Sequence, residues 1–267
     1  MKTVSSRDNP FYKELKALAT SSQARRKAGR SILDGVHLCQ SWLELKGLPA
    51  HCVVSEDALS NPEVAAIVER VEAARGHVTA LPEALFGAVS QVEHGVNLVF
   101  VVDTPSPQVP KALKESAVLL DGVQDPGNVG SILRSAAAAG IKQVWCSPGS
   151  AFCWSPKVLR AAMGAHFVLE IFENADLASL VRGAQVPVLA TSGYAADCLY
   201  DVELAGPVAW VLGHEGQGVS DELLRLASRR VAVPHAGQVE SLNVAACAAV
   251  CFFEQLRQSM QQRKRQP

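Results

Sequence analysis

Apolar residues follow two alternating patterns along the chain. Short apolar runs alternate with stretches in which apolar residues recur at helical spacing, as Phe11, Leu15 and Leu18 do in "NPFYKELKALA". The predicted strands are "SILDG", "HCVV", "HVTAL" and "NLVFVVD" and then "AVLLDG", "KQVWCS", "HFVLEIF", "VPVLATS", "PVAWVLG" and "RRVAVP". Because helical stretches lie between these strands, the pattern predicts an α/β layer architecture.

One proline-rich segment interrupts this alternation. "VDTPSPQVPKALKES" carries Pro105, Pro107 and Pro110 between two apolar strands, and proline at this density is typical of a linker. We therefore expect a smaller α/β domain over 1–104, a linker over 105–112 and a second domain over 113–267. A long apolar helix is expected to follow "ESLNVAACAAV", and the basic, Gln-rich tail from Gln258 is expected to fray.

Charge is distributed unevenly, although the formal net charge is only −1. Both ends are basic and the middle is acidic, which suggests a polyanionic partner; solvated termini are the alternative. No apolar run approaches the roughly 18 residues of a membrane span, so a cytoplasmic location and no membrane association are expected. The seven cysteines form no C-x-x-C pair and the seven histidines no H-x-x-x-H pair. We expect reduced thiols and no metal.

The stretch "LLDGVQDPGNVGSILRSAAAAG" has the layout of a nucleotide-binding loop: a strand, a turn with glycine, then a helix. It fails the dinucleotide pattern, because Asp125 stands at the first glycine position and the next strand ends without an acidic residue. The Gly-Lys-Ser/Thr of a P-loop is also absent. A nicotinamide-dependent oxidoreductase is therefore disfavoured.

The helix in this stretch has two faces. Its core stripe is predicted to comprise Val129, Ile132, Leu133, Ala136, Ala137 and Gly140. A second, small and polar face contains Gly130, Ser131 and Arg134. A guanidinium near free N–H groups of a helix N-terminus is suited to an external phosphate or carboxylate. A surface arginine paired with a nearby acid is the alternative.

Two further stretches carry candidate chemistry. "VAWVLGHEGQGVSDELL" places Gly213, Gly216 and Gly218 around Glu215 directly after an apolar strand. Such a cluster of glycines makes sense where a backbone approaches a ligand closely or adopts positive φ. "VAVPHAGQVESLNVAACAAV" places Ser241 and Asn243 at the head of the long helix, where either could be a simple N-cap.

Together the three stretches resemble the three ordered motifs of the SpoU (TrmH-type) RNA 2′-O-ribose methyltransferases of the SPOUT superfamily. The matching segments are Asp125–Gly130 with Arg134, Leu212–Gly218, and Pro234 with Ser241–Ala245. The resemblance covers about Leu119 to Gln255, and "WSPKVLRAAMGAHF" is similar to the family's intervening segment. His214 departs from the usual Asn, and Ala162 from a common Ser. The first part resembles, more loosely, the substrate-binding domain fused ahead of such enzymes.

The resemblance implies a parallel-sheet domain with a deep trefoil knot, formed from roughly Pro207 to the last helix. It implies S-adenosyl-L-methionine as the cofactor, a homodimer that shares its active site, and transfer of a methyl group to a ribose 2′-hydroxyl of RNA. Ribosomal RNA is favoured over transfer RNA because the extra domain suits a large structured target; a non-catalytic RNA-binding protein is a further alternative. The implied catalytic residues are Arg134, Asn128, Glu215, Ser241 and Asn243. The implied cofactor-binding residues are Leu212, Gly213, Glu215, Gly216, Gly218, Val233, Pro234, Ser241, Leu242 and Asn243.

Overall fold

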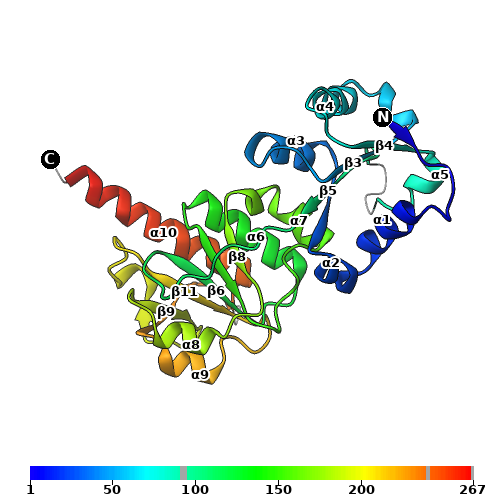
Figure 1. Cartoon of the computed structure of the whole chain (residues 1–267). Helices are drawn as coiled ribbons and strands as arrows, with labels where there is room; N and C mark the ends of the chain where they lie inside the picture. Colours follow the sequence, from blue (N-terminus) through cyan, green and yellow to red (C-terminus); the bar gives the residue numbers. More distant parts are fainter. Residues whose placement is uncertain (91–94, 239–240, 266–267) are drawn as a thin grey trace. The chain divides into compact units, whose positions relative to one another are not determined.

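The computed structural model describes residues 1–90, 95–238 and 241–265, and the chain divides into two compact units. Unit 1 comprises Met1–Pro105 and Trp154–Phe167, and unit 2 comprises Ser106–Cys153 and Val168–Pro267 (Figure 1). The division after Pro105 lies within the proline-rich segment. The segment Trp154–Phe167 belongs to unit 1, whereas the sequence pattern placed it in the second domain.

Unit 1 contains a mixed five-stranded sheet in the order β1-β4-β3-β5-β2. β1, β4 and β3 run parallel, and β5 runs antiparallel to both β3 and β2. The strands are β1 (Lys2–Thr3), β2 (Arg30–Asp34), β3 (His51–Ser55), β4 (Val78–Leu81) and β5 (Leu98–Asp103). The sequence pattern missed β1, which is too short to show any alternation of apolar and polar residues.

Helices cover both faces of this sheet. They are α1 (Pro10–Thr20), α2 (Ser22–Ala28), α3 (Val36–Leu45), η1 (Asp57–Ser60), α4 (Pro62–Ala73), α5 (Glu83–Phe86), α7 (Pro156–Ala162) and η2 (Ala165–Phe167). α1 and α5 bury Leu15, Leu18 and Phe86 against the sheet, and α3 and α4 lie on its other side (Figure 1). Phe167 packs edge-on against Trp42 of α3, with ring centroids 5.3 Å apart, which joins the inserted segment to unit 1.

Four helices begin with the same local signal, a capping side chain followed by proline. Asn9, Asn61, Asp125 and Ser155 each accept a hydrogen bond from a backbone N–H in the first turn of α1, α4, α6 and α7, respectively. The proline that follows fits the first helical position because its missing N–H has no partner there. These caps fix where the helices start from local sequence alone.

Unit 2 contains a seven-stranded sheet in the order β10-β12-β9-β11-β6-β7-β8. Each pair of neighbouring strands is parallel. The strands are β6 (Ala117–Asp121), β7 (Gln143–Cys146), β8 (Glu170–Phe172), β9 (Val188–Thr191), β10 (Asp197–Cys198), β11 (Ala209–Gly213) and β12 (Arg229–Ala232). Because parallel strands share one direction, the loops that follow β6, β9 and β11 meet at the same edge of the sheet.

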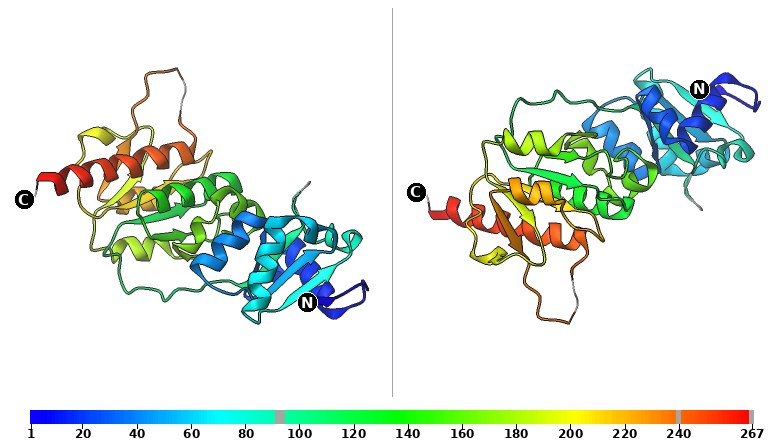
Figure 2. Two further views of the ribbon diagram at one scale, coloured as in Figure 1. Left: turned by 90° about the horizontal axis from the view of Figure 1, so that it is seen from above. Right: turned by 90° about the horizontal axis from the view of Figure 1, so that it is seen from below.

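Helices also cover both faces of this sheet. They are α6 (Pro126–Ala138), α8 (Leu177–Arg182), η3 (Leu199–Asp201), α9 (Asp221–Leu226) and α10 (Val244–Arg265). α8 and α9 pack on one face, over the stacked rings of Trp145 and Phe172, whose centroids are 3.9 Å apart. α10 lies alongside α6 (Figure 2). Within the described residues, no helix is both long and apolar enough to cross a membrane.

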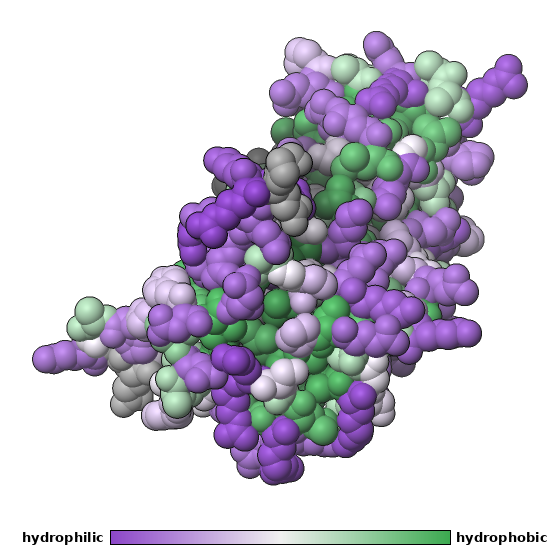
Figure 3. All heavy atoms as spheres, turned by 90° about the vertical axis from the view of Figure 1, so that its left-hand side faces the viewer, coloured by the Kyte–Doolittle hydropathy of each residue, from purple (hydrophilic) through white to green (hydrophobic). Residues whose placement is uncertain are grey.

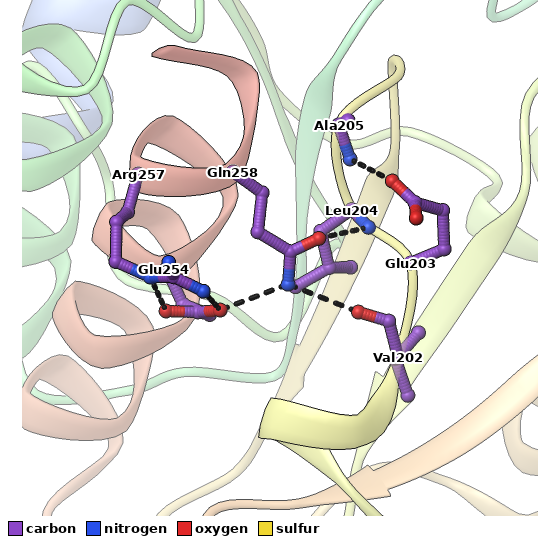
Figure 4. A network of polar contacts seen from close by, with 7 residues as sticks. All are labelled: Val202, Glu203, Leu204, Ala205, Glu254, Arg257 and Gln258. Atoms are coloured by element: carbon purple, nitrogen blue, oxygen red, sulfur yellow. Dashed lines mark hydrogen bonds and ion pairs between the residues drawn. The ribbon is translucent and has the colours of Figure 1, made fainter. Parts of the chain in front are cut away.

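Polar side chains in the second half of α10 fasten the helix to the loop that follows η3 (Figure 4). Arg257 donates hydrogen bonds of 2.7 and 2.6 Å to the carboxylate of buried Glu254. These bonds lower the pKa of Glu254 despite the opposing effect of burial. Gln258 donates to the carbonyl of Val202 at 3.0 Å and accepts from the N–H of Leu204 at 2.8 Å. The helix extends to Arg265, whereas the sequence pattern predicted fraying from Gln258.

One predicted strand is also wrong in its extent. Of "HFVLEIF", only Glu170–Phe172 forms a strand, because β7 offers partners to these residues alone. Met163 and Gly164 adopt positive φ and end α7, and η2 then carries His166 and Phe167 into the core. The apolar run thus serves two different environments, which a sequence pattern cannot separate. α2 was likewise missed, since it lacks an apolar stripe.

Candidate active site

A cavity of about 560 Å³ lies at the edge of the unit 2 sheet where the loops meet. The loops after β9 and β11, the segment after β12 and the start of α10 line it. Eight of the ten predicted cofactor-binding residues line this unit 2 cavity: Gly213, Glu215, Gly216, Gly218, Val233, Ser241, Leu242 and Asn243. A volume of this size suits a cofactor-sized ligand.

The other two predicted cofactor-binding residues do not line the cavity. Leu212 is fully buried within β11, where its side chain belongs to the core of the sheet. Pro234 is exposed and lies outside the lining, although its neighbours Val233 and His235 belong to it. The motifs thus include two kinds of residue: those that line the cavity, and others, such as Leu212 and Pro234, that do not.

The loop from Gly213 to Gly218 folds back on itself. His214 and Gly218 exchange backbone hydrogen bonds of 3.0 and 2.8 Å, and Gly218 has a φ of +73°. A Cβ at Gly213 would come within 2.1 Å of the backbone of Gly218, so this position excludes any side chain. The tight turn itself therefore requires glycine at position 213 and favours it at position 218, whereas a Cβ at Gly216 would make only ordinary contacts with the His214 ring.

The side chain of His214 accepts hydrogen bonds from the backbone of this loop. Its Nδ1 atom accepts hydrogen bonds from the backbone N–H groups of Gly216 at 2.9 Å and Gln217 at 3.3 Å. An Asn side chain, usual at this position in the family that the motifs resemble, has an oxygen that could accept the same bonds. The departure from Asn thus keeps a side-chain acceptor for the loop backbone.

Glu215 connects the three sequence motifs. Its carboxylate accepts hydrogen bonds from the backbone N–H groups of Gln124 (3.2 Å) and Asp125 (3.0 Å) and from Nδ2 of Asn128 (3.0 Å). Asn128 in turn accepts a hydrogen bond of 2.9 Å from Nδ2 of Asn243. Side chains that are far apart in the sequence thus form one hydrogen-bonded chain beside the cavity.

The charge of Glu215 is stabilised by this arrangement. Burial alone would raise the pKa of its carboxyl group. The hydrogen bonds from Asn128 and from the backbone of Asp125 and Gln124 outweigh burial and lower the pKa to about 2. The carboxylate also lies at the N-terminus of α6, where the helix dipole favours negative charge. Glu215 is therefore ionised and links the loop after β11 to the loop after β6. It cannot act as a proton donor near neutral pH.

The start of α6 differs from the sequence expectation. Free N–H groups were predicted there for an external phosphate, but the carboxylates of Glu215 and Asp125 accept from the N–H groups of Gln124, Asp125 and Asn128. Three N–H groups at the start of α6 are thus bound by the protein's own side chains.

Arg134 lies on α6, two turns after the cap. Its side chain is exposed, and no hydrogen bond or ion pair from it occurs among the described residues. It does not line the unit 2 cavity of its own chain. The alternative of a surface arginine paired with a nearby acid is therefore not observed among the described residues. Gly130, expected on the same polar face, is buried, and Gly140 of the expected core stripe is exposed beyond the end of α6.

Asn243 settles which residue caps the last helix. Its Oδ1 atom accepts from the backbone N–H groups of Ala245 (2.9 Å) and Ala246 (3.2 Å), while its Nδ2 atom reaches Asn128. Asn243 is both the N-cap of α10 and a member of the chain that joins the motifs. Ser241 lines the cavity and is exposed.

Sequence reasoning missed the cavity wall that follows β9. Thr191, Ser192, Gly193 and Tyr194 line the cavity, and Tyr194 is 99% exposed. The available signal was the apolar strand "VPVLATS", which leads into polar residues, just as β11 is followed by His214 and Glu215. Only the pairing of β9 with β11 places these ends side by side. Asp221 of α9 and Cys247 of α10 complete the wall.

A parallel α/β unit with a glycine-rich cavity at its strand ends is the architecture of a cofactor-binding domain. Comparison with known proteins makes the class specific. Residues 115–253 match the model of the SpoU rRNA Methylase family. The chain is 33% identical to an uncharacterized tRNA/rRNA methyltransferase of Synechocystis sp., over 96% of this chain and 94% of that protein. It is 30% identical to the 23S rRNA (guanosine(2553)-2′-O)-methyltransferase RlmP of Bacillus subtilis, over 95% and 98% of the two chains.

The fold agrees with this relationship. The crystal structure of an AdoMet-bound rRNA methyltransferase from Sinorhizobium meliloti matches with a TM-score of 0.82 and 27% identity, over 96% of this chain and 97% of that one. The chain belongs to the SpoU rRNA Methylase family.

Proposed function

We propose that this protein is an S-adenosyl-L-methionine-dependent RNA methyltransferase that methylates a ribose 2′-hydroxyl in ribosomal RNA. The observation that carries the proposal is the chain Glu215–Asn128–Asn243, which unites three motifs beside a cofactor-sized cavity. The relatives named as rRNA 2′-O-methyltransferases support ribosomal RNA as the substrate class.

The residues of the unit 2 cavity fit this cofactor. Backbone groups of Gly213, Gly216 and Gly218 can approach a ligand without side chains in between, and Asp221 adds a carboxylate suited to a cationic ligand. Ser241, Leu242 and Asn243 would hold the ligand from the side of α10. When bound, the cofactor supplies an electrophilic methyl group on a sulfonium.

The remaining requirement is a 2′-hydroxyl that is positioned and loses its proton. A guanidinium retains its proton in proteins, so Arg134 is best suited to binding the adjacent RNA phosphate and orienting the hydroxyl. The resemblance instead assigns it the role of base. Arg134→Lys separates the two roles: partial activity with an unchanged pH–rate profile favours orientation, and a shifted profile favours proton transfer.

A homodimer accounts for the position of Arg134. This residue does not line the cavity of its own chain, and the resemblance implies an active site shared by two copies. α10 exposes the apolar side chains of Phe253 and Met260, which are 47% and 50% accessible. Hydrophobic side chains also gather on the lower part of the face shown in Figure 3. Such surfaces are typical of contacts between protein copies.

The fold-level proposals follow from the family. We propose that the chain from about Pro207 to the start of α10 forms a trefoil knot, one of the rare exceptions to unknotted topology. The similarity to the Sinorhizobium meliloti enzyme supports this assignment. Residues 1–104 would act as the RNA substrate-binding domain, and the ribosomal substrate places the activity in the cytoplasm.

Arg134→Ala provides the test. We expect this variant to lose methyl transfer to ribosomal RNA while S-adenosylmethionine affinity, measured by calorimetry, stays at the wild-type level. Near-normal turnover would contradict the assignment. A wild-type protein without cofactor affinity would instead favour a non-catalytic RNA-binding protein, and activity confined to transfer RNA would change the substrate.

A mixing experiment tests the shared active site. Copies carrying Arg134→Ala are combined with copies carrying a cofactor-loop substitution such as Gly213→Val, each expected to be inactive alone. If each active site takes Arg134 from the other copy, mixed dimers regain part of the activity. A monomer in light scattering, or mixtures that stay inactive although dimers exchange, would contradict the shared site.

A further inference from the structure

Unit 1 contains a second pocket, which is smaller than the unit 2 cavity. It has a volume of about 300 Å³ and lies between α1 and the ends of strands β2, β3 and β5. Apolar side chains of α1 and Val101 form part of its wall. Phe11, Glu14, Arg30, His51 and His77 supply the aromatic and charged groups.

The aromatic groups of this unit 1 pocket form a row. The ring centroids of Phe11 and His51 are 4.3 Å apart, and those of His51 and His77 are 5.7 Å apart with nearly parallel planes at 16°. His51 is held in place by a 2.8 Å hydrogen bond between its Nε2 atom and the hydroxyl of buried Thr79. His77 is exposed and contributes little to the hydrophobic core. A fixed row of rings that ends at the surface offers planar faces to a planar ligand.

Charged groups lie at the side of the row. Arg30 donates to Glu14 at 3.1 Å and to Asp103 at 3.4 Å, so its guanidinium is held by two carboxylates. Burial, followed by electrostatic effects of His77, Arg30 and Lys2, lowers the pKa of His51 against the opposing effect of Glu14. The His51 ring is therefore neutral near pH 7 and suited to stacking.

Exposed cations lie on elements that neighbour the pocket, and one of them, Lys13, is paired with Asp8 at 3.0 Å. Lys13 and Lys16 are exposed on α1, the helix that carries Phe11 and Glu14, and Lys2 lies on the strand next to β4. Lysines on elements that neighbour an aromatic pocket can contact the phosphates that flank a bound base. Recognition of single-stranded RNA combines the same elements: aromatic or imidazole faces, polar groups for base edges and nearby cations.

We propose that the unit 1 pocket binds one unpaired nucleobase of the RNA substrate. The base stacks on the row formed by Phe11, His51 and His77. Its edge meets the carboxylate of Glu14, which accepts hydrogen bonds, and the guanidinium of Arg30, which donates them. The RNA must be single-stranded at this point, because a base within a helix exposes no free face. This inference rests on the proposed function insofar as RNA is the substrate.

The test uses the full-length chain and a short single-stranded RNA that contains 2-aminopurine, whose fluorescence falls on stacking. We expect quenching with this RNA and much less with the same RNA annealed to its complement. His77→Ala should weaken binding about tenfold, the effect of losing one stacking contact. His77→Phe should restore affinity, because it keeps a ring without the imidazole nitrogens. His51→Ala is expected to act in the same direction, and exposed His77 keeps the test valid if that variant misfolds.

His37→Ala is the matched control, an exposed histidine of unit 1 outside the pocket, and it should leave binding unchanged. The salt dependence of binding should be the same for His77→Ala and wild type, because no phosphate contact is lost. Wild-type affinity in His77→Ala, equal quenching by duplex, or no quenching at all would overturn the inference.

Cofactor calorimetry and methyl transfer to ribosomal RNA, measured on the same samples, separate the two proposals. If wild type methylates RNA but His77→Ala binds and quenches normally, the pocket assignment fails and the function stands. If wild type binds no S-adenosylmethionine but quenching depends on His77, the function fails and the pocket stands.

Discussion

The two sheets of this protein create binding sites in different ways. In unit 2 the parallel strands end at one edge, so the loops after β9 and β11 and the start of α10 form one cavity there. In unit 1 the antiparallel β5 breaks this common direction, and the pocket forms between α1 and the sheet. The first cavity depends on backbone shape and on hydrogen bonds between loops, whereas the second depends on a row of rings that ends at exposed His77. Substitutions in the unit 2 cavity should therefore change cofactor affinity, and substitutions in the unit 1 pocket should change stacking with RNA.

The largest effect on cofactor affinity is expected from Gly213→Ala. The added Cβ would overlap the backbone of Gly218 and Val219, which a rotamer change cannot relieve. Overpacking of this kind costs about 1–3 kcal/mol or more, and cofactor affinity should fall about 10- to 100-fold. Calorimetry with S-adenosylmethionine measures the loss.

Gly183→Ala is the matched control within unit 2. Its Cβ would lie 3.7 Å from the Ser179 carbonyl oxygen, an ordinary contact, so cofactor affinity should not change. RNA quenching at the unit 1 pocket should be normal in both glycine variants. A Gly213→Ala protein that binds cofactor like wild type would show that the tight loop is not needed.

Glu215→Gln tests the hydrogen bonds that link Glu215 to the loop after β6 and to Asn128. The amide keeps one acceptor but directs a donor at groups that themselves donate, so we expect about a tenfold loss in kcat/KM, or roughly 1.4 kcal/mol. Amide hydrogen exchange at Gln124 and Asp125 should accelerate. Unchanged exchange at both amides would mean that the carboxylate does not hold this loop.

The same carboxylate sets a pH dependence. Because the folded-state pKa of Glu215 is lowered to about 2, the stabilisation from its hydrogen bonds is fully present above the unfolded-state pKa. It is lost only as the pH falls toward 2. The Glu215 carboxyl resonance should therefore show no titration between pH 8 and about 5. A midpoint above 4 in NMR would contradict the hydrogen-bonded geometry.

The smallest effect is expected at His214. His214→Ala removes the one atom that accepts from two backbone N–H groups, and we expect a total loss of about 1 kcal/mol, or several-fold in cofactor affinity. His214→Asn supplies an oxygen in its place and should bind cofactor nearly as well as wild type. Equal affinities in all three proteins would show that the loop folds without this side chain.

Much of the fold could be predicted from local patterns. The long apolar runs became β6, β9 and β11, and the Asn-Pro and Asp-Pro pairs mark where helices begin, since both signals act over a few neighbouring residues. The run "HFVLEIF" misled because half of it meets the core of unit 1 and half pairs with β7. Strand pairing is a long-range property, and apolar periodicity does not report it.

The candidate site divides in the same way. The sequence by itself determined the glycine loop, the motif residues and the family, because a tight turn and a ligand-facing backbone restrict residue type at fixed spacing. Only the tertiary structure decided that Glu215 occupies the N-terminus of α6 and that Asn243 reaches Asn128. It also decided that Tyr194 joins the cavity and that Phe11, His51 and His77 form a row. These contacts depend on which strands become neighbours, and that is determined by burial of the whole sheet rather than by any short segment.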